Sequence, residues 1–139
     1  MSAPKTIAVL ATLDTKGQEA EYLRERLAGL GSRALVVDLG VVGSPAEGSH
    51  ADVAREEVAR AGGTPLDELL RDPSREAAAP VMIAGATRLL RERLERGELH
   101  GVLGLGGLQG TAACSAVMRA LPVHCWGGCT PSKPPTPMR

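Results

Sequence analysis

The sequence predicts an α/β fold of the Rossmann-like type, in which a parallel sheet of three strands in the order 2-1-3 is flanked by helices. Short apolar runs alternate along the chain with amphipathic helical segments, which is the pattern of parallel strands joined by helical crossovers. Glycine-bearing turns follow the first and third apolar runs, at residues 13–17 and 104–111. Each turn marks the place where a strand leads into a helix.

The first predicted strand is the apolar run 6–12, which is typical of a strand covered on both faces. A helix is expected next, because apolar residues recur every three or four positions from Ala20 to Leu30. Thr15 and Gln18 have the spacing of a capping box at its start. Gly31 supplies a left-handed stop at its end.

The second strand, residues 34–38, completes a strand–helix–strand unit with the length of a right-handed parallel crossover. A loop is expected over 39–50, since this stretch is rich in glycine and contains a proline. Helical periodicity predicts helices at 54–61 and 74–96, with a short turn that Thr64 caps between them.

The third strand begins at Val102 and runs directly into the glycine-rich loop 104–111, and a helix is expected over 112–120. The prolines of residues 124–139 and the absence of either periodicity predict an irregular tail. We therefore expect a nucleotide-binding domain over residues 1–123, followed by this proline-rich segment.

Composition excludes several classes of partner. Lys+Arg and Asp+Glu both number 16, and aromatic residues make up 1% of the chain, so a nucleic-acid surface with basic charge and stacking rings is not expected. The apolar run near the N-terminus is too short to cross a membrane and is not a signal peptide. Three cysteines do not make a disulfide framework, which favours the cytoplasm.

The two turns are expected to meet at one ligand site. With strand order 2-1-3, the direction of winding switches between strands one and three, and ligands of open α/β sheets bind at the carboxyl ends of strands at that switch. Gly106, Gly107 and Gly110 would let the backbone approach a phosphate. Thr111 would donate its hydroxyl, and Lys16 would supply positive charge.

Three further residues complete the predicted site. Asp14 would hold a hydrated Mg²⁺ or cap the first helix, Thr15 would act beside it, and Asp38 would accept from a ribose hydroxyl. Each of the eight residues also has a purely structural interpretation: glycines in a tightly packed turn, helix caps, a solvated lysine and a turn aspartate.

Other chemistry is less well supported. Gly110 is followed by Thr111 where a Walker A loop needs lysine. The spacing of Gly104, Gly106 and Gly110 is one residue too wide for a dinucleotide-binding fingerprint, so NAD is only the alternative ligand. Cys114 is interpreted as a packed core residue. His124, Cys125 and Cys129 are three zinc-type ligands without a fourth, so neither a metal site nor a catalytic residue is expected.

Four segments together resemble the ATP-binding domain family related to the tomato mosaic virus resistance protein, which includes plant inhibitors of tobamovirus RNA replication and bacterial proteins of unsettled function. The resemblance covers residues 5–123 and is carried by Thr12–Gly17, Val37–Val41, Gly101–Thr111 and Met118–Pro122. It implies a Rossmann-like N-terminal domain that binds ATP and precedes a second α/β domain. The residues implied to contact nucleotide are Asp14, Thr15, Lys16, Gly106, Gly107, Gly110 and Thr111.

We therefore expect an ATP-binding N-terminal module of a larger bacterial cytosolic protein, with a regulatory or scaffolding role. One alternative is the nucleotide-binding half of an ATP- or NAD-dependent enzyme whose chemistry lies in a missing C-terminal half, and another is a structural fragment without a ligand. The departure of residues 124–139 from the family pattern is interpreted as a truncated or frameshifted reading. A sheet that lacks a strand would expose an edge through which two copies can associate.

Overall fold

The computed structural model describes residues 3–71, 76–122 and 126–129. They form one parallel sheet in the order β2-β1-β3-β4. The α/β class and the predicted 2-1-3 order of the first three strands are confirmed. The elements in chain order are β1 (Thr6–Ala11), α1 (Leu13–Gly29), β2 (Arg33–Asp38), α2 (Arg55–Ala61), α3 (Leu66–Arg71), α4 (Ala78–Glu95), β3 (Gly101–Leu105), α5 (Leu108–Ala120) and β4 (Trp126–Cys129).

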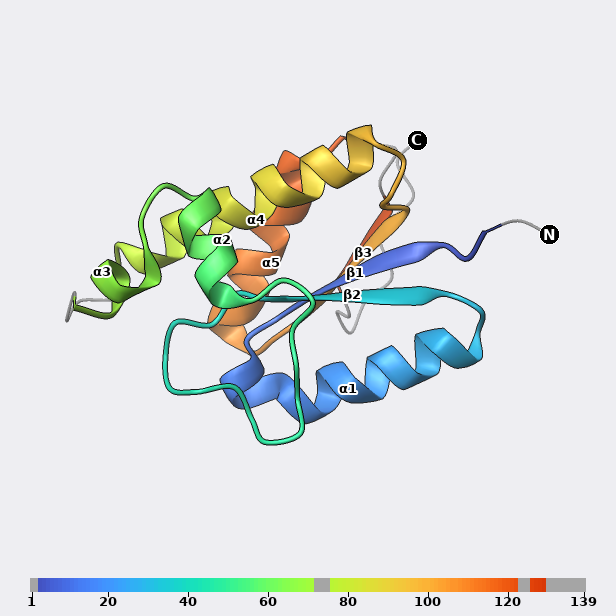
Figure 1. Ribbon diagram of the computed structural model, residues 1–139, viewed down its shortest axis with the longest axis horizontal. Coiled ribbons are helices and arrows are strands. Elements are labelled where there is room, and N and C mark those ends of the chain that lie inside the picture. The colour runs from blue at the N-terminus through green and yellow to red at the C-terminus, as the bar shows by residue number, and fades with distance from the viewer. Residues whose placement is uncertain (1–2, 72–75, 123–125, 130–139) are drawn as a thin grey trace.

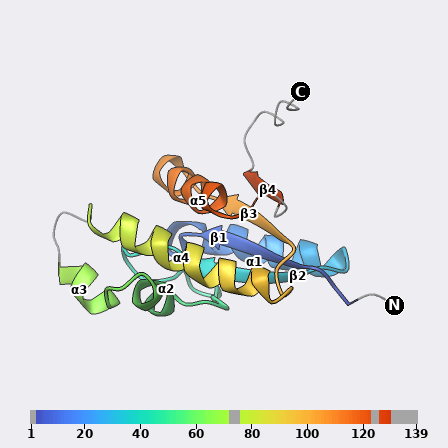
Figure 2. The ribbon, with the colours of Figure 1, turned by 90° about the horizontal axis from the view of Figure 1, so that it is seen from above.

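Helices cover both faces of the sheet and create two separate cores. Helix α1 lies on one face, and α2, α4 and α5 lie on the other (Figures 1 and 2). Side chains of β1 alternate between them, so Ala8 and Leu10 pack toward α4 and α5 whereas Val9 and Ala11 pack toward α1. All four are fully buried, which explains why β1 reads as a continuous apolar run.

Helix α1 ends as predicted but begins differently. Gly31 has a φ of 81°, and the Ser32 N–H donates to the Leu27 carbonyl at 2.8 Å, as in a Schellman ending. The helix starts at Leu13, and a kink at Lys16 separates its first turn from the rest. The Thr15 hydroxyl lies 3.0 Å from the hydroxyl of the N-cap residue Thr12, where a capping box between Thr15 and Gln18 was expected.

Two other boundaries differ from the prediction. Helix α5 starts at Leu108, four residues early, because its cap is Gly107 and Gly110 therefore lies within the first helical turn. The prediction of an irregular conformation is wrong for residues 126–129. They form strand β4, which pairs in parallel with β3 from Gly101 to Gly104. Backbone hydrogen bonding does not require alternating side chains, which is why periodicity missed it.

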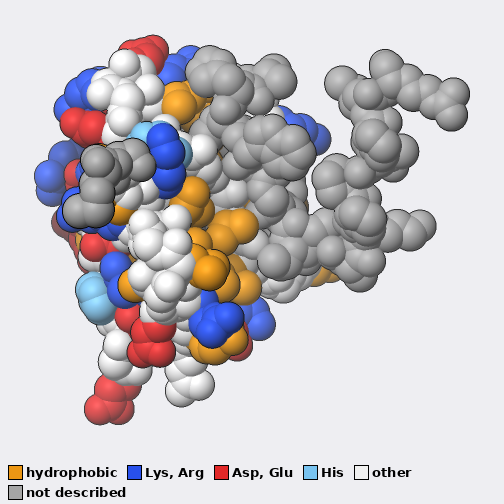
Figure 3. All heavy atoms as spheres, turned by 90° about the vertical axis from the view of Figure 1, so that its right-hand side faces the viewer, with side chains coloured by type: hydrophobic (Ala, Val, Ile, Leu, Met, Phe, Trp, Pro, Cys, Tyr) orange, Lys and Arg blue, Asp and Glu red, His pale blue; other side chains and the backbone are white. Residues whose placement is uncertain are grey.

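The described surface carries charges of both signs. Figure 3 views the amino edge of the sheet, where acidic and basic side chains surround a patch of apolar ones and neither sign dominates. Within the part of the chain that the structure describes, no helix is long and apolar enough to cross a membrane.

Helices α2 and α4 approach each other through two glycines. A methyl group at Gly85 of α4 would collide with the Val58 carbonyl oxygen of α2, and one at Gly62 would collide with the Val81 carbonyl oxygen of α4. Because both obstacles are backbone atoms, neither can rotate away. This reciprocal contact determines how closely α4 and α2 approach each other.

We predict that Gly85→Ala lowers the free energy of unfolding by at least about 1–3 kcal/mol, the usual cost of overpacking a core. Gly29→Ala is the matched control, because no atom lies within 4 Å of its added methyl group and alanine is the better helix former. Urea denaturation followed by circular dichroism measures both. Equal stabilities for the two variants would contradict the proposed helix contact.

Candidate functional site

A pocket of about 650 Å³ opens at the carboxyl edge of the sheet. The turns after β1 and β3 both line it, so the predicted meeting of the two glycine-bearing turns at one pocket is confirmed. The loop after β2 and the first half of α4 form the remaining walls. The lining residues are Ala11, Thr12, Asp14, Thr15, Leu39, Gly40, Val41, Val42, Ala79, Met82, Ile83, Gly107, Leu108, Gln109, Gly110, Ala113 and Cys114.

The turn after β1 brings two of its three predicted site residues to the pocket. Asp14 and Thr15 line it together with Thr12. Lys16 does not line the pocket, and its Nζ lies 3.9 Å from a carboxylate oxygen of Glu19. The backbone kink at Lys16 separates the pocket-facing first turn from the remainder of α1.

The four predicted residues of the β3–α5 turn serve different purposes. Gly107 and Gly110 line the pocket, and a methyl group on either would meet no atom within 4 Å. Gly106 is required by packing, because its methyl group would lie 2.8 Å from the backbone of Gly110. The Thr111 hydroxyl donates to the Gly106 carbonyl at 3.1 Å. The turn is therefore closed on one side and open toward the pocket on the other.

The N-terminus of α5 has no side-chain cap. Its capping residue is Gly107, which contributes no side chain, and no acidic residue lies in the first turn. The first backbone N–H with an intrahelical acceptor is that of Thr111, which donates to the Gly107 carbonyl at 2.8 Å. The preceding N–H groups of the first turn have no carbonyl to bond within a helix, and they add to the positive end of the helix dipole.

Asp38 is a brace between two loops. Its side chain is 2% exposed, and its Oδ1 accepts the Leu13 N–H at 3.2 Å and the Gly40 N–H at 2.8 Å. Asp38 does not line the pocket, although Gly40 does. The carboxylate therefore joins the end of β1 to the end of β2 beneath the pocket.

Burial raises the pKa of the Asp38 carboxyl above its ordinary value. The two accepted N–H groups and the positive charge of Arg55 act in the opposite direction, and the negative charge of Asp14 adds to the rise. Arg55 was not foreseen from the sequence. It is 14% exposed at its side chain and donates to the Gly43 carbonyl at 2.7 Å.

One wall of the pocket is apolar and escaped prediction. Ala79, Met82 and Ile83 of α4 face the loop that carries Val41 and Val42. Met82 is 2% exposed, so it packs into the core as well as lining the pocket. Helix α4 reaches the carboxyl edge because of the direction in which it crosses the sheet. The sequence around Met82 carries no signal for this direction.

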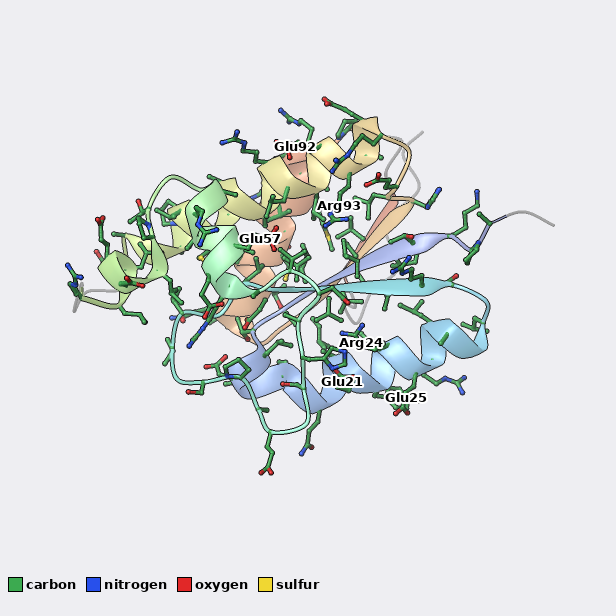
Figure 4. All side chains as sticks on the ribbon, in the orientation of Figure 1. Glu21, Arg24, Glu25, Glu57, Glu92 and Arg93 are labelled. Carbon is green, nitrogen blue, oxygen red and sulfur yellow. The ribbon has the colours of Figure 1, made fainter. Side chains whose placement is uncertain are left out.

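A polar network secures the β2–α2 loop to α1. Glu21 and Arg24, labelled in Figure 4, lie on the side of α1 nearest this loop. Arg24 donates to the Asp52 carboxylate and to the His50 carbonyl, both at 2.9 Å. Asp52 also accepts the Val36 N–H at 2.8 Å. The far end of the pocket-lining loop is thus attached to both α1 and β2.

The predicted packing role of Cys114 is confirmed. It is 1% exposed, and its sulfur donates to the Leu10 carbonyl at 3.5 Å. Of the residues with zinc-type ligands, His124 and Cys125 lie outside the described residues. Among residues 3–71 and 76–122, no three acidic, histidine or cysteine side chains gather in a way that would hold a metal ion.

The raised pKa of Asp38 predicts a pH-dependent stability. A carboxyl with a higher pKa in the folded state binds its proton more tightly when folded, so folding is favoured while it is protonated. As pH rises from the ordinary value of 3.8 through the raised folded value, the ionised group must stay buried, and its contribution to stability falls.

Asp38→Asn retains an oxygen acceptor for the two N–H groups and does not titrate. We predict that wild-type protein loses stability relative to Asp38→Asn as pH increases from below 3.8 to neutrality. Asp38→Ala removes the acceptor and should be about 1–3 kcal/mol less stable than Asp38→Asn at every pH, since neither variant titrates at this position. Urea denaturation across this range tests both, and a constant difference between wild type and Asp38→Asn would refute the linkage.

Comparison with known proteins places the chain in a bacterial family. Residues 5–125 match the domain described as "Uncharacterised protein family (UPF0261) N-terminal domain". UPF0261 proteins of Clostridium tetani and Rhizobium meliloti are each 34% identical over 119 residues, which is 86% of this chain and 29% and 28% of theirs. One from Brucella suis is 28% identical over 117 residues, or 84% of this chain and 28% of its own length.

The chain thus spans less than a third of the length of these relatives. The match extends across all the helices of the fold and over the turns that line the pocket. The chain belongs to the UPF0261 family and corresponds to its N-terminal domain.

Proposed function

We propose that this domain binds ATP in the pocket at the carboxyl edge of its sheet, with the phosphates held between the turns after β1 and β3. The observation that carries the proposal is the convergence, in one pocket of about 650 Å³, of an uncapped helix N-terminus with an apolar wall. The first suits a phosphate chain and the second suits a base. The resemblance to the ATP-binding domain related to the tomato mosaic virus resistance protein supports the same ligand.

The phosphates would contact backbone more than side chains. Gly107 and Gly110 leave room at the start of α5, so oxygens can approach its N–H groups without meeting a Cβ atom. The Thr15 hydroxyl lies at the facing turn. Lys16, at the kink that follows, is 34% exposed at its side chain and would swing from Glu19 to add positive charge.

A divalent cation would balance the charge of the triphosphate. The lining within the described residues contains no lysine or arginine and one carboxylate, Asp14. A hydrated Mg²⁺ bridging Asp14 and the phosphates would replace repulsion by attraction. The Asp38 carboxylate is engaged with backbone N–H groups. Its contribution to ribose binding would therefore be indirect, by positioning the loop that contacts the ribose.

We propose that the domain is part of a larger bacterial protein of the cytosol, because its relatives extend far beyond the matched region. Its proposed role within that protein is regulatory or scaffolding. The alternative is that it supplies ATP or NAD to a reaction carried out by the remainder of such a protein. Association of two copies through an outer strand of the sheet is part of the same proposal.

Gly110→Ala separates binding from folding. The new methyl group meets nothing in the protein and should raise stability by about 0.5–1 kcal/mol, because alanine is favoured over glycine within a helix. It also occupies the space through which a phosphate would reach the helix N-terminus. Losing one hydrogen bond to a charged group costs about 1.5–3 kcal/mol, so ATP affinity should fall about ten- to a hundredfold.

Calorimetric titration with ATP, ADP and NAD at constant Mg²⁺ measures these affinities. Gly29→Ala is the control, since it makes the same substitution in α1 with open space around it and lies outside the pocket, and it should bind like wild type. Unchanged affinity in Gly110→Ala, or the absence of ATP binding by wild type, contradicts the proposal. Tighter binding of NAD favours the enzyme alternative.

A further inference from the structure

The hydrogen-bonding side chains of the pocket are segregated to one side. Thr12, Asp14 and Thr15 belong to the turn after β1, and Gln109 belongs to the first turn of α5. All four therefore lie on the two turns that the proposed function assigns to the phosphates. The α4 wall contributes none.

The opposite side offers a base only apolar contact. Its side chains come from Leu39, Val41 and Val42 of the β2–α2 loop and from Met82 and Ile83 of α4. None of these side chains carries an oxygen or nitrogen that could pair with the edge of a base.

Backbone groups at this wall are also partly engaged. The Leu39 N–H donates to the Ala11 carbonyl at 2.9 Å, and the Gly40 N–H donates to Asp38. The Gly43 carbonyl accepts from Arg55. These bonds hold the loop in place and leave fewer backbone N–H and carbonyl groups that could hydrogen-bond to the edge of a base.

Two exposed apolar side chains stand at the mouth of the pocket. Leu108, at the start of α5, is 93% exposed, and Val42, on the β2–α2 loop, is 38% exposed. Both also line the pocket. Large apolar side chains so exposed beside a pocket are suited to cover the faces of a flat ring.

We propose, on the basis of the proposed function, that the pocket selects nucleoside triphosphates as a class by burying the ring and does not distinguish adenine from guanine. A site discriminates strongly between similar ligands only when it places hydrogen-bonding groups that one of them leaves unpaired. The apolar wall has no such side chains. Leu108 lies on the turn assigned to the phosphates, and its exposed side chain would extend from there over the ring and contribute affinity, whichever purine is bound.

The test compares ATP, GTP, CTP and inorganic triphosphate by calorimetric titration at one Mg²⁺ concentration. We expect ATP and GTP to bind within about threefold of each other, CTP less tightly because its ring is smaller, and inorganic triphosphate more weakly than any of them. An affinity difference between ATP and GTP of about a hundredfold would show that the pocket hydrogen-bonds to the edge of the base, and it would overturn the inference.

Leu108→Ala tests the covering side chain. Leu108 is so exposed that its loss should not disturb folding, and Leu70→Ala is the matched control, because Leu70 is 54% exposed on α3 and lies outside the pocket. Leu108→Ala should weaken ATP and GTP binding equally, by about three- to tenfold, and leave inorganic triphosphate binding unchanged. Leu70→Ala should change none of these affinities.

The outcomes distinguish this inference from the proposed function. If neither nucleotides nor inorganic triphosphate bind to wild type, the proposed function fails. If ATP binds but inorganic triphosphate binds equally well, or if Leu108→Ala affects ATP and GTP unequally, the phosphate site stands and the ring-burial inference fails.

Discussion

The geometry of the pocket depends on the buried carboxylate of Asp38. The parallel sheet brings the ends of β1 and β2 side by side, but backbone pairing stops where the loops diverge. Asp38 continues the connection by accepting one N–H from each loop, at Leu13 and at Gly40. A buried carboxylate is costly unless it is hydrogen-bonded, and these bonds offset part of that cost. The floor of the pocket is therefore held by an interaction that the secondary structure alone does not supply.

The glycines divide into those that the fold requires and those that it leaves open. Gly62, Gly85 and Gly106 each lie against backbone atoms that a methyl group would strike, so packing alone explains them. Gly107 and Gly110 meet nothing, and neither has the positive φ that favours glycine. Gly107 is the N-cap of α5, a position where glycine is common. The lack of a side chain at Gly110 has no structural explanation in the described residues, and a ligand that approaches the backbone would account for it.

The sequence was sufficient for the order of β1, β2 and β3 and for the edge of the sheet on which the pocket lies, but not for strand β4. Apolar runs and helical periodicity predicted the strand order, and the two glycine-bearing turns predicted the edge on which the pocket lies. Local pattern could not predict the start of α5 at Leu108, because Gly110 reads as loop although it lies within a helix. It could not predict the α4 wall either, since whether Ile83 faces a pocket depends on the crossing of α4 over β1 and β3. The brace at Asp38 likewise depends on tertiary contacts.

The pocket has two sides of unequal stiffness. On the α4 side, the glycine contact with α2 sets backbone against backbone, so α4 has no room to move closer to α2. On the facing side, residues 39–43 form a loop whose last residue, Gly43, has a φ of 61°. Its hydrogen bonds run from the Leu39 N–H to Ala11, from the Gly40 N–H to Asp38 and from Arg55 to the Gly43 carbonyl. We therefore expect the loop to adjust to ligands of different bulk more readily than α4, whose approach to α2 is already limited by backbone contact.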